Sequence, residues 1–236
     1  MGTSKPLKHH HEPDSVGSEM RNIILGWQDG LVNVLGVILA VAAATVDTKT
    51  VIIAGLAATF AESISMAAVA YTSSKASRDF YNRELQVEKM EIKKFPELER
   101  KEIRDIYYKK GFRGKQLESI VKKLTSSKEL WLETMMSEEL GLSKDHNTPG
   151  KSALIVGVSA FVGSLFPLMP FLFLTAANAV MPSLILSVAV LFCLGSVKAR
   201  LTVGNWLKSG AEIAAIGLAA ALIGYGLGAV LGAAIG

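Results

Sequence analysis

The chain has 236 residues, half of them hydrophobic, and a formal net charge of +4 at pH 7. Its charges are unevenly spread: residues 152–197 and 213–236 carry none, whereas residues 75–151 hold 18 basic and 14 acidic side chains. Uncharged stretches of this length exclude a soluble globular protein and indicate a membrane protein with one polar insert. The single cysteine, Cys193, excludes an intrachain disulfide and a cysteine-based metal site.

Five apolar segments are long enough to cross a bilayer as helices, which takes about 20 residues each. In chain order they cover about residues 23–46, 51–73, 152–173, 178–197 and 210–235. Pro167, Pro170 and Pro182 are expected to mark the turn that divides the long uncharged block into spans three and four.

These segments predict an all-α membrane protein with five transmembrane helices and a helical insert between spans two and three. Its expected divisions are a polar tail at 1–21, spans one and two at 22–74, the insert at 75–150 and spans three to five at 151–236. Of the 25 basic residues, 24 would lie on one side of the membrane, and only Lys49 on the other. The positive-inside rule therefore predicts that the N-terminal tail and the insert are cytosolic.

The insert is expected to consist of helices. No proline or glycine occurs between Gly55 and Pro96, so span two should continue unbroken into the insert. Proline and glycine positions then predict three further helices, at about 96–110, 115–125 and 127–140.

Two acidic residues lie inside predicted spans. Asp29 is the only charged residue of segment 22–46, and Glu62 is the only one of segment 50–74. A carboxylate at bilayer depth costs at least about 2–3 kcal/mol, so these acids indicate a function. Met66 follows Glu62 by one helical turn and shares its face. A carboxylate beside a thioether suits a path for a divalent transition metal.

Depth along the helices relates these three residues. Asp29 lies about 7 Å and Met66 about 6 Å to the cytosolic side of the midpoints of their spans, with Glu62 one turn deeper. We therefore expect Asp29, Glu62 and Met66 to line one pore. The alternatives are that Asp29 is an interfacial anchor, that Glu62 only hydrogen-bonds a neighbouring helix, and that Met66 faces lipid or fills the core.

The insert holds a second group of candidate ligands. Its acids form pairs three residues apart, each pair sharing a helical face, and a further glutamate lies one turn after two methionines. Carboxylates beside thioethers favour Fe²⁺, Mn²⁺, Co²⁺ or Zn²⁺ over Mg²⁺ or Ca²⁺. Alternatively, these acids belong to ordinary solvated helix faces. The candidate ligands are Glu88, Glu91, Glu99, Glu102, Met135, Met136 and Glu139.

Four short motifs, in this order and spacing, resemble the vacuolar iron transporters of the plant-type branch, which carries a cytosolic metal-binding domain. The first, at residues 24–31, ends in Asp-Gly-Leu, and the second, at 64–66, is Ile-Ser-Met. The third, at 131–142, contains Trp-Leu, Met-Met and Glu-Leu-Gly-Leu, and the fourth, at 167–170, is Pro-Leu-Met-Pro. The resemblance covers nearly the whole chain from about residue 21.

This resemblance implies a homodimer with a pore between the subunits and proton-coupled antiport of Fe²⁺ out of the cytosol. Zn²⁺, Mn²⁺ or Co²⁺ would be related cargo, without a prosthetic group or nucleic acid partner. The membrane would be vacuolar in a eukaryote and the plasma membrane in a prokaryote. Asp29 and Met66 match the pore residues of the family, and the seven insert residues match its metal ligands. Where the family pattern has a carboxylate two turns before the methionine, this chain has Ala58, and we expect Glu62 to take over that role.

The main competing interpretation is an enzyme, a membrane-tethered ferritin-like di-iron oxidase. Such sites use Glu-x-x-His motifs from two helices. The only histidine after residue 11 is His146, which has no glutamate three residues before it. A structural scaffold whose insert binds partner proteins is a weaker alternative, because it leaves the intramembrane acids unexplained.

Overall fold

The computed structural model describes residues 13–143, 148–202 and 204–235. Its helices are distributed over two compact units, each of which is described separately. One unit comprises the chain up to Thr72 and from Pro149 onward, and the other is Ser73–Thr148. Part of the predicted polar tail, residues 1–21, lies outside the described residues.

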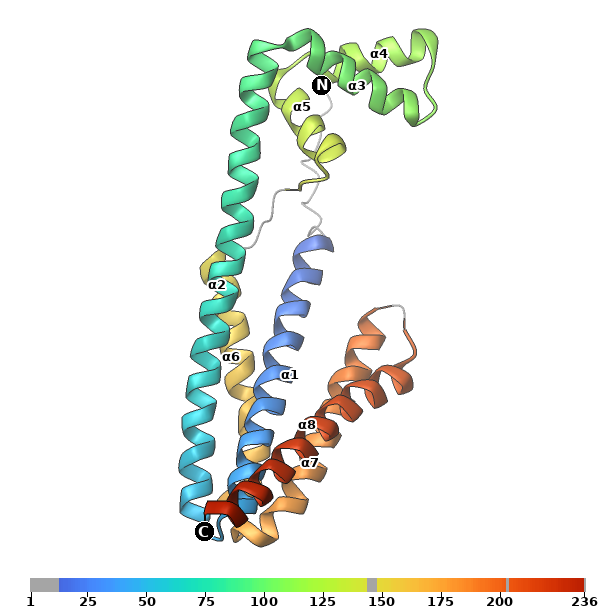
Figure 1. Ribbon diagram of the computed structural model, residues 1–236. Helices are drawn as coiled ribbons and strands as arrows, with labels where there is room; N and C mark the ends of the chain where they lie inside the picture. The colour runs from blue at the N-terminus through green and yellow to red at the C-terminus, as the bar shows by residue number, and fades with distance from the viewer. Residues whose placement is uncertain (1–12, 144–147, 203, 236) are drawn as a thin grey trace, which may run out of the picture. The chain divides into compact units, whose positions relative to one another are not determined.

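The first unit contains the helices that can cross a membrane (Figure 1). In the described part of the chain, five helices are long and apolar enough to do so, which confirms the prediction of five spans. They are α1 (Pro13–Ala44), α2 (Thr48–Lys94), α6 (Pro149–Leu168) with the 3₁₀ turn η2 (Met169–Leu172), α7 (Ala176–Leu201) and α8 (Trp206–Ile235). At 47 residues, α2 is about 70 Å long, so only its apolar part is needed to cross a bilayer about 30 Å thick.

The turn between spans three and four differs from the expectation. Pro167 lies inside α6 and Pro182 inside α7, and the α-helical path ends only at η2, which contains Pro170. Each of these prolines removes one backbone hydrogen bond from its helix, and both helices nevertheless continue through it. The Ser183 hydroxyl donates a 2.7 Å hydrogen bond to the Pro167 carbonyl, which satisfies an acceptor that the end of α6 leaves open.

Glycines allow α1 to pack closely between α6 and α8. A Cβ on Gly30 would lie 2.2 Å from the Ala160 carbonyl oxygen of α6, and one on Gly228 would lie 2.0 Å from the Ala40 carbonyl oxygen of α1. Such small-residue contacts let transmembrane helices approach backbone to backbone. They also fix the rotation of α1 about its axis, since any turn of the helix would replace glycine by a larger side chain.

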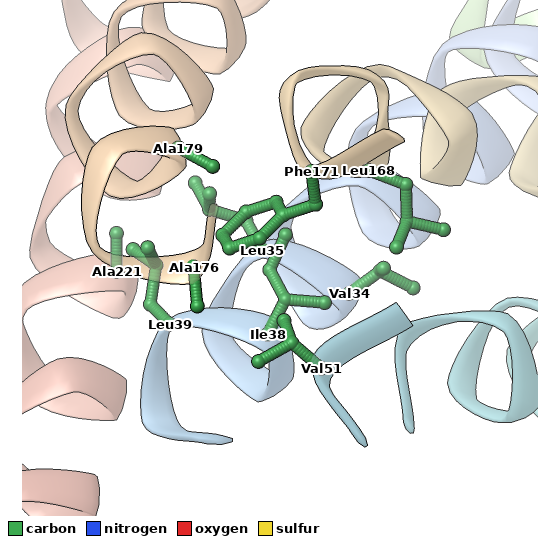
Figure 2. Packing of buried hydrophobic residues seen from close by; sticks show 10 residues of the cluster. All are labelled: Val34, Leu35, Ile38, Leu39, Val51, Leu168, Phe171, Ala176, Ala179 and Ala221. Atoms are coloured by element: carbon green, nitrogen blue, oxygen red, sulfur yellow. The ribbon is translucent and has the colours of Figure 1, made fainter. Parts of the chain in front are cut away.

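An apolar core joins the membrane-type helices near the turn between α1 and α2. Figure 2 shows Phe171 of η2 among side chains of α1, with α2 and α7 contributing at the edges. The buried members of this core are Val34, Leu35, Ile38, Leu39, Val51, Leu168, Phe171, Ala176, Ala179 and Ala221.

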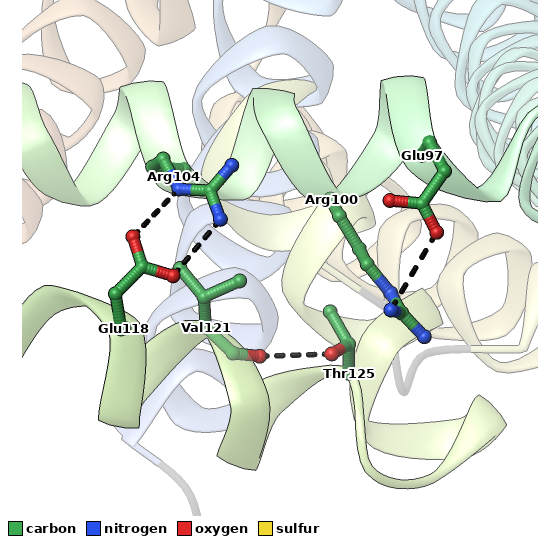
Figure 3. Close-up of polar contacts among 6 residues, drawn as sticks. All are labelled: Glu97, Arg100, Arg104, Glu118, Val121 and Thr125. Atoms are coloured by element: carbon green, nitrogen blue, oxygen red, sulfur yellow. Dashed lines mark hydrogen bonds and ion pairs between the residues drawn. The ribbon is translucent and has the colours of Figure 1, made fainter.

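The second unit is helical, as predicted. The end of α2 is followed by α3 (Pro96–Lys109), α4 (Gly114–Leu124), α5 (Lys128–Thr134) and the π-helical turn η1 (Met135–Glu139). Their apolar faces meet in a core around Ile103, Leu117 and Trp131. On the surface, Arg104 pairs with Glu118 at 2.9 Å and joins α3 to α4 (Figure 3).

The last insert helix is not one α-helix, as expected for 127–140. After Thr134 the chain widens into η1, in which the Leu140 amide donates to the Met135 carbonyl five residues earlier. Gly141 then ends the segment with a positive φ of 63°. Single π turns inside α-helices often occur at functional sites, and this one carries three of the candidate ligands.

Candidate metal sites

The structure brings two intramembrane carboxylates together. The Glu62 side chain of α2 lies close enough to Asp29 and Asn33, both on α1, to interact with each of them. Asp29 and Glu62 are half-buried, and Asn33 is exposed on the single chain. Because Asn33 follows Asp29 by one helical turn, the three side chains form one polar group inside two otherwise apolar segments.

Close packing against α6 also fixes the orientation of α2 around Glu62. A Cβ on Gly157 of α6 would lie 2.8 Å from the Ala67 side chain and 3.2 Å from the Ser63 carbonyl oxygen. The Ser63 hydroxyl is buried and donates at 2.6 Å to the Thr59 carbonyl within its own helix. Glu62 precedes Ser63 and is half-buried.

Met66 lies on the same half-buried stripe of α2 as Glu62, one turn away. Ala58, where the family pattern has its carboxylate, lies on this stripe one turn before Glu62. The structure therefore brings Asp29 and Glu62 into contact, whereas it places Met66 only on the face that Glu62 occupies.

Asn33 is a polar neighbour of Glu62 that the sequence patterns did not single out. It carries no charge, so a search for charges in apolar segments passes over it. Two signals could have identified it: Asn33 is a polar residue in the middle of a span, and it stands one turn after Asp29.

In the insert, three glutamates from three elements converge. Glu88 of α2, Glu99 of α3 and Glu139 of η1 place one carboxylate oxygen each within 4.8 Å of one another, close enough to share one metal ion. Glu88 is 4% and Glu99 3% exposed, whereas Glu139 is exposed. One carboxylate oxygen of Glu88 and one of Glu99 are buried without a hydrogen-bond partner among the described residues. Buried carboxylate oxygens of this kind are suited to bind a cation.

Burial and mutual repulsion change the acidity of this cluster. Burial, followed by the charge of Glu139, raises the pKa of Glu88 to about 7, and burial, followed by the charge of Glu102, raises the pKa of Glu99 to about 7. Burial also raises the pKa of Glu139, with Glu102 and Glu91 adding to the effect. Near neutral pH the empty cluster therefore binds protons that a divalent cation would displace.

The remaining candidate ligands surround this cluster at different distances. Glu91 and Glu102 are half-buried and act on the three glutamates through their charge. Met135 is completely buried and packs in the apolar core with Ile103 and Trp131, and Met136 is 2% exposed. The structure thus brings three of the seven predicted residues together as one group, with two more acids at its flank.

Comparison with known proteins identifies the family of this chain. Residues 20–229 match the sequence model of the VIT family. The protein belongs to the VIT family. It is 34% identical to Vacuolar iron transporter 1 of Oryza sativa subsp. japonica, over 93% of this chain and 89% of the relative. Vacuolar iron transporter 1 of Arabidopsis thaliana is 32% identical over 95% of this chain and 91% of its own length.

The matches extend beyond plants. Vacuolar iron transporter of Toxoplasma gondii is 30% identical to this chain, with coverage of 92% of the chain and 76% of the relative. Membership of the VIT family confirms the resemblance drawn from the four motifs. Together with five helices that can span a bilayer, it makes this chain a multi-pass integral membrane protein.

Proposed function

We propose that this VIT-family protein carries Fe²⁺, and related divalent ions such as Mn²⁺, Co²⁺ or Zn²⁺, across its membrane and out of the cytosol in exchange for protons. One observation carries the proposal: Glu62 contacts Asp29 and Asn33 inside two spans that hold no other charge. Intramembrane acids that face each other rather than lipid commonly mark ion pathways. The names of the relatives supply iron as the cargo.

Transport would begin at the insert. Under the proposed orientation the insert is cytosolic, and Glu88, Glu99 and Glu139 capture the metal there. Asp29 and Met66 then replace part of its water shell at the mouth of the pore, and Glu62 receives it one turn deeper. Two adjacent carboxylates repel each other strongly unless a proton or a cation lies between them. Entry of a metal ion therefore releases a proton, which supports antiport.

A second copy of the chain would complete the pore. On α1, residues at intervals of four form a stripe along one face of the helix. Its side chains are exposed or half-buried on the single chain: Leu25, Asp29, Asn33 and Val37. Lipid tails cannot form hydrogen bonds with the two polar side chains of this stripe, whereas the same stripe on the α1 helix of a second subunit can. We therefore assign the protein a homodimer in which the two first spans line the pore. The membrane would be vacuolar in a eukaryotic cell and the plasma membrane in a prokaryotic one.

Uptake of Fe²⁺ into proteoliposomes, with a pH-sensitive dye inside, tests this function. Asp29→Asn and Glu62→Gln should each abolish uptake and proton release while leaving the protein folded, as judged by its elution and helicity. Glu212→Gln is the matched control, since Glu212 is an exposed acid near the start of α8 and outside the site. Unchanged uptake by both site variants would refute the proposal.

The oxidase interpretation makes a different prediction for the same preparation. An oxidase would consume oxygen when Fe²⁺ is added, and the loss of Glu88 or Glu99 would stop that consumption. The three-glutamate cluster contains no histidine among the described residues, and His146 lies outside them. Metal-dependent proton flux without oxygen consumption is the result that supports a transporter.

A further inference from the structure

Asn33 is an exposed polar residue in the middle of the first span. It contacts Glu62, and it stands one turn from Asp29 on the open stripe of α1. The other open members of that stripe, Leu25 at 44% and Val37 at 40% exposed, are apolar. Asn33 is thus a polar side chain in the middle of the span, where a leucine or valine in contact with lipid would cost less free energy.

Depth along the helices agrees with the observed contact. Counting 1.5 Å per residue, Asn33 lies about 6 Å deeper than Asp29 and close to the midpoint of the first span. Glu62 lies close to the midpoint of the second span. Asn33 is therefore at the level of Glu62, and Asp29 and Met66 form the level above, toward the proposed cytosolic mouth.

The chemistry of an amide differs from that of the two acids. The Asn33 side chain can donate hydrogen bonds from its NH₂ group to the Glu62 carboxylate and still offers a carbonyl oxygen. That oxygen is a ligand for a divalent ion but adds no negative charge to the site. A site of two carboxylates and one amide binds a divalent ion less tightly than three carboxylates would, and so releases it more readily.

We propose that Asn33 is a member of the intramembrane metal site, in which its NH₂ group holds the Glu62 carboxylate in place and its carbonyl oxygen is a neutral ligand for the passing ion. This inference rests on the proposed transport function and extends it. It assigns the deeper level of the path to the pair Asn33 and Glu62. The competing explanation is that Asn33 only joins α1 to α2 as a packing contact.

Cobalt binding to the full-length protein in detergent separates these explanations. The background is a chain in which Glu88, Glu99 and Glu139 are replaced by Gln, so that calorimetric heat reports the intramembrane site. In this background Asn33→Leu should weaken Co²⁺ binding about 10- to 100-fold, since a hydrogen bond to a charged group is lost. Ile64→Ala is the control, since Ile64 is an exposed apolar residue of α2 at a similar depth and outside this stripe, and it should leave the affinity unchanged.

A double-mutant cycle then tests whether Asn33 acts through Glu62. If it does, the effect of Asn33→Leu should become much smaller once Glu62→Gln is present. Asn33→Asp, which keeps the shape of the side chain, should bind Co²⁺ more tightly than the parent but take up Fe²⁺ more slowly in proteoliposomes.

The outcomes separate failure of this inference from failure of the proposed function. Unchanged affinity in Asn33→Leu, or an effect of equal size with and without Glu62→Gln, would overturn the role of Asn33 and leave the transport proposal intact. If the background chain with native Asp29, Asn33 and Glu62 binds no Co²⁺ at all, the intramembrane metal site falls, and the role of Asn33 falls with it.

Discussion

Metal binding by the insert should depend steeply on pH between 6 and 8. Glu88 and Glu99 have pKa values of about 7 in the empty cluster, so at pH 6 both carry protons that a metal ion must displace. For two such groups the apparent Kd should rise about 100-fold from pH 8 to pH 6, whereas two carboxylates with a pKa of about 4.5 would change it by less than about 10%.

Calorimetric titration of the full-length protein with Co²⁺ at pH 6, 7 and 8 measures this dependence. The insert component is the heat that disappears when Glu88, Glu99 and Glu139 are all replaced by Gln. Glu88→Gln alone should reduce the change between pH 8 and pH 6 to about tenfold, because one titrating group remains near pH 7. Glu118→Gln is the matched control, since Glu118 is an exposed acid of the same unit that pairs with Arg104.

Equal affinity for Co²⁺ at pH 6 and pH 8 would refute the reasoning. It would mean that Glu88 and Glu99 are already ionised in the empty cluster, or that the metal binds elsewhere. A strong pH dependence that persists in the triple variant would likewise exclude these glutamates as its source.

Three further predictions concern packing, the thioether and stability. Gly30→Ala should lower the midpoint of thermal unfolding, because its Cβ would lie 2.2 Å from the Ala160 carbonyl oxygen and such overpacking costs about 1–3 kcal/mol. Gly36→Ala, whose Cβ would meet nothing within 4 Å, should leave it nearly unchanged, and equal effects would contradict the close contact of α1 with α6. Met66→Leu conserves volume and should fold normally but take up Fe²⁺ more slowly in proteoliposomes; normal uptake would remove the sulfur atom from the path. In urea unfolding of the metal-free protein, Glu88→Gln should raise stability at pH 8 by up to about 3 kcal/mol and change little at pH 4. The raised pKa costs the folded state stability progressively as pH rises from about 4.5, where the unfolded chain ionises, to about 7.

The membrane part of the fold could be predicted because it depends on quantities that the sequence displays directly. Uncharged segments of about 20 residues predict spans whatever their neighbours are, and all five are present. The turn at Pro167 and Pro182 was less predictable, since a proline breaks a helix only where its missing donor and its ring cannot be accommodated. The hydrogen bond from the Ser183 hydroxyl to the Pro167 carbonyl, which links α7 to α6, likewise could not be predicted from a sequence pattern.

For the candidate sites, the sequence could predict which residues are suited to bind a metal, but not how those residues are arranged in space. Spacing shows that Glu88 and Glu91 share a helical face, but packing of the insert core decides which of the acids meet. The π-helical turn η1 is an example. Its hydrogen bond joins residues five apart, and Glu139 of this turn meets Glu88 and Glu99, an arrangement that depends on tertiary packing. Depth counting predicts Asp29 and Met66 at one level with Glu62 one turn deeper, but it cannot show that Asn33 lies beside Glu62, which only the coordinates reveal.

The acidic cluster of the insert lowers the stability of the fold when it holds no cation, and this links metal supply to the state of the insert. Burial disfavours ionised Glu88 and Glu99, and their neighbours repel them. The core around Ile103, Leu117 and Trp131 and the surface pair of Arg104 with Glu118 stabilise the insert independently of these acids. Under the proposed function, a divalent ion would remove the repulsion and bind only the folded arrangement, and so would stabilise the insert in proportion to the logarithm of its concentration. Scarce metal would then leave the insert at its least stable, a consequence of placing three carboxylates where a fold selected for stability alone would place apolar side chains.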